Sequence, residues 1–233
     1  MPDLDDLLDI RTRRPAAIGA AATARKKPAS LFGPHGKLMI IAADHPARGA
    51  LRAGDDPLAM ANRTDLLDRI RTALARPGVN GVLGTPDILE DLLLLGALDD
   101  KVVIGSMNRG GLAGTTFEID DRFTAYDAES IATAGFEGGK MLLRIDPADP
   151  GTVTTLESCG TAIGELAARR RMAMVEPFIS HRVDGRVRNE LTADAMVRAN
   201  AVAAGLGSTS AYTWLKVPIV DEMERAMAAT TLP

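Results

Sequence analysis

The sequence predicts an α/β protein with the architecture of a (β/α)₈ TIM barrel, truncated after its sixth β/α unit. The first observation is a short apolar segment, bounded by Gly, Pro or Asp, that recurs along the chain as buried parallel strands do. The second is that a segment with helical periodicity follows each one, so that strand and helix alternate six times in 233 residues. This alternation indicates a parallel sheet, either closed into a barrel or open and doubly wound. The third is that no G-x-G-x-x-G motif follows the first strand, which disfavours the open, dinucleotide-binding form.

The individual elements follow from their boundaries and their apolar positions. The strands are expected at residues 38–44, 79–85, 101–108, 138–146, 172–180 and 212–219. The helices are expected at residues 57–75, 86–98, 125–134, 152–171, 192–204 and 220–229. Thr85 and Pro86 suit the N-cap and the first position of the second helix. Because a barrel of this kind has eight strands, and a seventh would begin where this sequence ends, we expect a truncated barrel.

Two regions are expected in the chain. Residues 1–30 are predicted to form an N-terminal arm that packs on the domain surface, and residues 31–233 to form the partial barrel. Leu4, Leu7 and Leu8 are expected to line one face of a short helix in the arm. The acidic start of the arm argues against a targeting peptide.

Composition excludes several classes of function. A net charge of −4 and an aromatic content of 3% disfavour a nucleic-acid-binding protein. No apolar run approaches the roughly 20 residues that cross a bilayer. Cys159 is the single cysteine, which fits a reducing cytoplasm, and the three histidines lack metal-ligand spacing. We therefore expect a cytoplasmic protein that uses neither a metal nor a cofactor and binds neither nucleic acid nor a membrane. We also expect it to form a homo-oligomer.

Charged residues share one phase of several expected strands. Alternate residues of a barrel strand face the barrel interior, and three charges in one phase cannot face an apolar helix layer. The inward-facing charged set is therefore Asp44, Lys140, Arg144, Asp146, Glu176 and Lys216, with Trp214 facing the same way. Most of these residues lie toward the carboxyl ends of their strands, where barrel active sites form.

Two interpretations of this set remain open. Burying charges is unfavourable unless they are paired or used, and three cations with three carboxylates would balance in a layer of salt bridges. In the functional interpretation, desolvation of Lys216 and the second cation Lys140 both favour a neutral amine. Such an amine attacks a ketone and forms a Schiff base, while Asp44 or Glu176 moves protons.

Three segments carry a resemblance to a known family. GGKMLLRIDPADPGT, MVEPFIS and YTWLKVP resemble the class I, Schiff-base aldolases around tagatose-bisphosphate and deoxyribose-phosphate aldolase. The resemblance is strongest to the predicted (β/α)₈ aldolase of bacterial inositol-catabolism clusters, and it runs from about residue 38 to the end. It implies that Lys216 forms the Schiff base and that Lys140, Glu176 and Asp44 are the other catalytic residues. One departure is Arg144, which stands where a tyrosine is common in that family.

The resemblance also implies a reaction. A phosphorylated keto-sugar would be cleaved to dihydroxyacetone phosphate and an aldehyde, and inositol catabolism would make the substrate 2-deoxy-5-keto-gluconate 6-phosphate. Arg144, His45, Trp214 and Asp146 are expected to contact this sugar phosphate, whose phosphate site is expected beyond residue 233. The alternatives are a Schiff-base acyltransferase acting on a phosphorylated dicarbonyl and a non-catalytic sugar-phosphate-binding barrel.

Overall fold

The computed structural model describes residue 4 and residues 6–33 and 35–233. The chain forms two compact units. The first unit comprises residues 1–106 and 130–137, and the second comprises residues 107–129 and 138–233. None of the helices in the described residues is long and apolar enough to cross a membrane.

The first unit is built on three short parallel strands. β1 (Ile40–Ala43), β2 (Gly81–Gly84) and β3 (Val102–Ser106) pair in chain order. α3 (Arg63–Leu74) packs on β1, and α4 (Pro86–Leu94) packs on β2 and β3. The remaining elements are the 3₁₀ turn η1 (Pro46–Arg48) and α5 (Ala128–Thr133), which spans the boundary between the units. The parallel strand–helix alternation predicted for this part of the chain is therefore present.

The N-terminal segment forms two short helices. α1 spans Asp6–Arg13 and α2 spans Ala17–Ala24. The α1 residues that are buried are Leu7 and Ile10, whereas Leu8 is 77% exposed. The prediction that Leu8 lies on the buried face is therefore wrong, because that face is formed by Leu7 and Ile10, which are three positions apart. α2 packs on α4.

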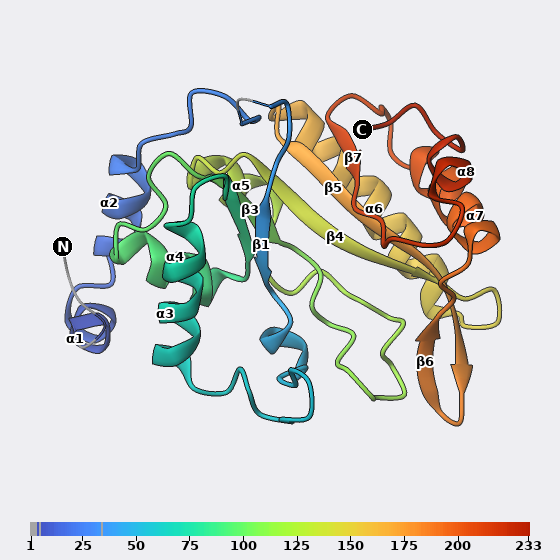
Figure 1. The fold of residues 1–233 in the computed structure, drawn as a ribbon, viewed down its shortest axis with the longest axis horizontal. Helices are drawn as coiled ribbons and strands as arrows, with labels where there is room; N and C mark the ends of the chain where they lie inside the picture. Colours follow the sequence, from blue (N-terminus) through green and yellow to red (C-terminus); the bar gives the residue numbers. More distant parts are fainter. Residues whose placement is uncertain (1–3, 5, 34) are drawn as a thin grey trace. The chain divides into compact units, whose positions relative to one another are not determined.

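The second unit contains two longer parallel strands and a hairpin. β4 (Gly138–Ile145) pairs with β5 (Met172–Val183), which also pairs in parallel with the short β7 (Thr213–Leu215). α6 (Gly151–Ala168) packs on β4 and β5, and α7 (Ala193–Ala204) packs on β5 and on α8 (Met223–Met227) (Figure 1).

One strand was not expected from the sequence. β6 (Arg186–Asn189) pairs antiparallel with the end of β5, so that β5 runs past residue 180 into a hairpin. Asp184 and Gly185 form its turn with φ of 50° and 75°. Asp-Gly is a favoured pair for two-residue hairpins, because both central positions require a positive φ. This dipeptide was the sequence signal for the missed strand.

Several expected helices are shorter in the structure. The helix expected at 57–75 begins at Arg63 because the Asn62 side chain caps it by accepting from the Asp65 N–H at 3.1 Å. The helix expected at 220–229 is confined to Met223–Met227. Thr85 is the N-cap of α4, as predicted, but its hydroxyl donates to the Asp87 carboxylate instead of accepting from the helix backbone.

A cap at the start of α7 gives a first test of the fold. The Thr192 side chain accepts from the Ala195 N–H at 3.2 Å. We expect Thr192→Ala to destabilise the protein by about 1 kcal/mol, which lowers Tm by roughly 2–4 °C in a chain of this size. Thermal unfolding followed by circular dichroism measures this shift. Thr161→Ala, at an exposed position within α6, is the control, and an equal fall in Tm there would contradict the capping role.

Candidate active site

Three of the predicted site residues meet in the second unit. Leu142 lies opposite Glu176, and Val175 lies opposite Leu215, so Lys140, Glu176 and Lys216 project from the same face of neighbouring strands. The Lys140 Nζ lies 2.5 Å from the Glu176 Oε2, and the Lys216 Nζ donates to the Glu176 Oε1. The Lys216 N–H donates to the Val175 carbonyl at 2.8 Å, which holds Lys216 in line with β7. One carboxylate therefore joins two lysines.

The side chains of this cluster differ in exposure, which increases from Lys140 on β4 to Lys216 after β7. The exposed fraction of the side chain is 4% for Lys140, 13% for Glu176 and 39% for Lys216. Burial alone would raise the pKa of Glu176, but the charges of Lys140 and Lys216 and the hydrogen bonds from both outweigh it. The pKa of Glu176 is therefore lowered, and Glu176 is an anion at neutral pH. Among the three candidates, Lys216 is the one that a dissolved carbonyl compound reaches most easily.

Asp44 and His45 lie in the first unit, directly after β1. Asp44 is buried, and the Ser106 hydroxyl donates to its Oδ2 at 3.1 Å. His45 is largely exposed, with its Nδ1 3.7 Å from the Asp44 Oδ1, which is beyond hydrogen-bond distance. Ser106 was not identified from the sequence. The available signal was its place at the carboxyl end of β3, which the strand register aligns with Asp44.

Arg144 and Asp146 have protein partners in the second unit. The Arg144 Nη1 lies 2.7 Å from the Glu118 Oε1, its Nη2 donates to the Glu118 carbonyl, and Asp121 lies 3.8 Å away. The Asp146 carboxylate accepts from the Ala148 N–H at 3.0 Å in the turn that leads into α6. Both residues thus have structural roles, and substrate contact stays a prediction for each. Trp214 is half-buried in β7 opposite Met174.

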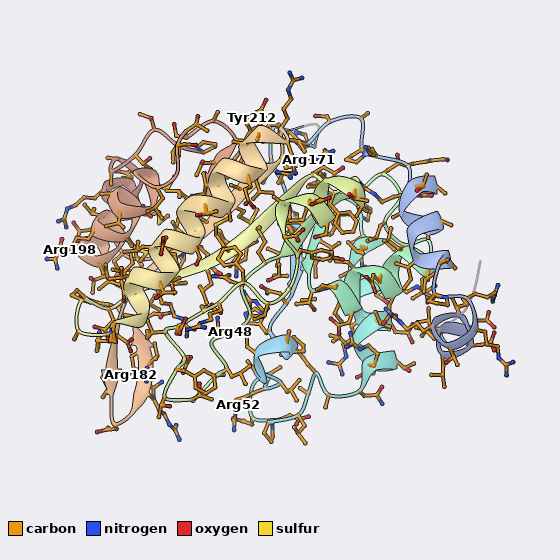
Figure 2. All side chains as sticks on the ribbon, turned by 180° about the vertical axis from the view of Figure 1, so that it is seen from behind. Arg48, Arg52, Arg171, Arg182, Arg198 and Tyr212 are labelled. Carbon is orange, nitrogen blue, oxygen red and sulfur yellow. The ribbon has the colours of Figure 1, made fainter. Side chains whose placement is uncertain are left out.

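The segment 107–129, between β3 and α5, is fixed to the rest of the second unit. Its Gly111 lies so close to the Glu118 carbonyl that a Cβ would sit 2.1 Å from that oxygen. Arg182 in the hairpin donates to the Thr116 carbonyl at 2.6 Å and lies 3.0 Å from Asp149 (Figure 2). His181, which precedes Arg182, is exposed. The segment 107–129 is therefore a packed loop in this structure.

Within the described parts of the chain, no group of three or more His, Cys, Asp or Glu side chains gathers as a metal site requires. Cys159 is buried, and burial, together with the charge of Asp121, raises the pKa of its thiol to about 12. The thiol is therefore not a nucleophile at neutral pH.

Comparisons with known proteins place this geometry in a family. The crystal structure of Cgl0159 from Corynebacterium glutamicum is 52% identical, with a TM-score of 0.96 over 98% of this chain and 77% of that chain. An archaeal fructose 1,6-bisphosphate aldolase is 19% identical, with a TM-score of 0.60 over 93% of this chain and 77% of that chain. A Schiff-base-forming fructose-1,6-bisphosphate aldolase is 18% identical, with a TM-score of 0.55 over 91% of this chain and 85% of that chain.

The two aldolases show a similarity of fold. The predicted α/β architecture is confirmed at this level, while the closed barrel stays a prediction. No curated protein matches the sequence. The family model described as Cgl0159-like matches residues 36–233, and the chain belongs to the Cgl0159-like family.

Proposed function

We propose that the protein is a class I, metal-independent aldolase in which Lys216 forms a Schiff base with a ketone. The observation that carries this proposal is the cluster of Lys140, Glu176 and Lys216, in which a buried lysine and a more exposed lysine share one carboxylate. The aldolase-like fold supports it, since one of those structures is described as Schiff-base-forming. We further propose that residues 31–233 form part of a (β/α)₈ barrel that assembles as a homo-oligomer in the cytoplasm.

The charges of the cluster explain how Lys216 becomes a nucleophile. Two ammonium groups and one carboxylate leave a net positive charge in a largely buried place, which the loss of one proton removes. The proposed mechanism uses Lys216 in its neutral form, because Lys216 is the more exposed of the two amines and the one that a carbonyl compound reaches, while Glu176 stays paired with Lys140. The neutral Nζ attacks the carbonyl carbon, and loss of water from the adduct gives an iminium.

The iminium then accepts electrons from the bond that breaks. A base removes the proton of the hydroxyl on the β-carbon, two carbons from the iminium carbon. The bond between the α- and β-carbons cleaves, its electron pair moves toward the iminium to give an enamine, and the β-carbon leaves as the aldehyde. We assign the base role to Glu176 or Asp44. Protonation of the enamine carbon and addition of water release the ketone and restore the Lys216 amine.

We propose a phosphorylated keto-sugar as the substrate, with dihydroxyacetone phosphate as the retained product. The first compound to assay is 2-deoxy-5-keto-gluconate 6-phosphate. His45, Trp214, Arg144 and Asp146 are the residues proposed to contact it.

Borohydride trapping tests the proposal directly. The protein is incubated with dihydroxyacetone phosphate, reduced with borohydride, and analysed by intact mass and peptide mapping. We expect one stable adduct on Lys216 and its complete loss in Lys216→Met. Lys101→Met is the matched control, because the Lys101 Nζ donates to the Val79 carbonyl in the first unit and its removal should leave the adduct intact.

A non-catalytic sugar-phosphate-binding protein is the second candidate, because Glu176 satisfies both ammonium groups as a salt-bridge layer would. Binding of the sugar phosphate by calorimetry without any adduct would favour that candidate and contradict the aldolase. Transfer of an acyl group to a thiol cofactor would instead favour a Schiff-base acyltransferase.

A further inference from the structure

Asn108 forms an unusual contact with β4, the strand that carries Lys140. The Leu142 N–H donates to the Asn108 Oδ1 at 2.7 Å, and the Asn108 Nδ2 donates to the Leu142 carbonyl at 2.6 Å. One fully buried side-chain amide thus satisfies both backbone polar groups of one strand residue. Asn108 takes no part in the mechanism proposed above, and the sequence analysis did not identify it.

The backbone around Asn108 is held on its other side. Residues 107–110 run antiparallel to residues 122–125, with a β-bridge between Asn108 and Phe123. The Ala125 N–H donates to the Met107 carbonyl at 3.0 Å, and the Gly110 N–H donates to the Arg122 carbonyl at 3.0 Å. Because the backbone of Asn108 faces residues 122–125 in this way, Asn108 contacts β4 through its side chain.

The same segment contacts the lysine itself. The Met107 N–H donates to the Lys140 carbonyl at 2.9 Å. The opposite edge of β4 pairs with β5, where Lys140 lies opposite Met174 and Leu142 lies opposite Glu176. β4 is therefore held at both edges, and the side-chain amide of Asn108 supplies two of the contacts on the edge away from β5.

We propose that Asn108 is a positioning residue that fixes β4 along its axis, and with it the Lys140 ammonium against Glu176. The proposal rests on the proposed function, because it gives Asn108 an effect on the reaction of Lys216 through the shared carboxylate. The 2.5 Å contact between Lys140 and Glu176 requires a precise strand position. A displacement of about 1 Å in an active site can slow a reaction by about 100-fold.

The test separates positioning from folding. Asn108→Leu keeps the size of the side chain and removes both polar atoms, and Asn108→Ala is the second variant. Asn200→Leu is the matched control, since Asn200 is also fully buried in the second unit, where its Nδ2 donates to the Ala226 carbonyl at 3.0 Å. Borohydride quenching at successive times after adding dihydroxyacetone phosphate gives both a rate constant and an amplitude for adduct formation on Lys216.

We expect the rate constant to fall by about 10- to 100-fold in the Asn108 variants, with most of the amplitude retained. The Asn200→Leu rate constant should stay within about twofold of the wild-type value, since Ala226 lies outside β4. A purely structural defect would lower the amplitude and leave the rate constant unchanged. That result, or a wild-type rate constant in folded Asn108→Leu, would overturn the proposal.

Hydrogen exchange of the unmodified protein supplies a second readout. The Leu142 amide should exchange as slowly as that of Leu143, its neighbour in β4. Exchange of Leu142 at the rate of an exposed loop amide would overturn the proposal even if both Asn108 variants failed to fold. If the wild type forms no adduct, the proposed function fails, and the exchange measurement still decides whether Asn108 holds the strand.

Discussion

Glu176→Gln should be among the most damaging single substitutions in the second unit. It removes the one carboxylate between two ammonium groups, of which that of Lys140 is almost fully buried. Breaking a buried ion pair from one side typically costs about 3–5 kcal/mol. We expect the lower end, because the amide oxygen still accepts one hydrogen bond and because water screens the more exposed Lys216. Tm should fall by roughly 10 °C.

In acid, Glu176→Gln should no longer be less stable than the wild type. The pKa of Glu176 is lowered in the folded protein, so its contribution is fully present above the unfolded-state value of about 4.3. As the pH falls from there through the lower folded-state pKa, the wild type loses this contribution and Glu176→Gln does not. The difference in unfolding free energy between the two proteins, measured in urea, should therefore shrink below about pH 4.

Glu165→Gln is the control for this prediction, because it neutralises an exposed carboxylate on α6. It should leave stability within about 0.5 kcal/mol of wild type. A Glu176→Gln protein that is as stable as wild type at pH 7 would contradict the buried cluster itself. In that case the side chains of Lys140 and Lys216 do not meet at the Glu176 carboxylate.

Strand phase, taken from the sequence, is enough to select Lys140, Glu176 and Lys216 as residues of one face. It is not enough to give their distances. The sequence analysis treated Lys140 as a cation acting on Lys216, whereas the structure places Glu176 between them. Alternation along a strand fixes a direction, but the partner of each charge depends on the register between strands, which only the fold supplies.

The same limit explains the residues that the sequence analysis missed. Asn108 ends the strand expected at 101–108, and Glu118 lies in a segment with no periodicity, so no pattern connects either residue with β4. Their roles appear only when 107–129 folds back on that strand. The hairpin differs, because Asp184-Gly185 was a readable turn signal within a segment assigned to a loop.

Arg144→Met distinguishes two roles for Arg144. One is the substrate contact predicted from the sequence, and the other is to anchor the 107–129 loop. The Arg144 side chain is 5% exposed, and its partners Glu118 and Asp121 are 13% and 0% exposed. Methionine keeps much of the length and apolar contact of arginine and leaves two largely buried carboxylates without this cation. If Arg144 anchors the 107–129 loop, we expect a loss of about 3–5 kcal/mol in urea unfolding.

If Arg144 instead binds an anionic group of the substrate, the KM of Arg144→Met should rise while its Tm stays near the wild-type value. Adding Glu118→Gln to Arg144→Met should recover part of the lost stability, because the second change removes one of the carboxylates left without its cation. Arg122→Met is the control, since Arg122 lies in the same loop with an exposed side chain, and it should not change Tm. An Arg144→Met protein with unchanged Tm and a raised KM would contradict the anchoring role and support the predicted contact between Arg144 and the substrate. A fall in Tm together with rescue by Glu118→Gln would instead mean that Arg144 holds the 107–129 loop against β4.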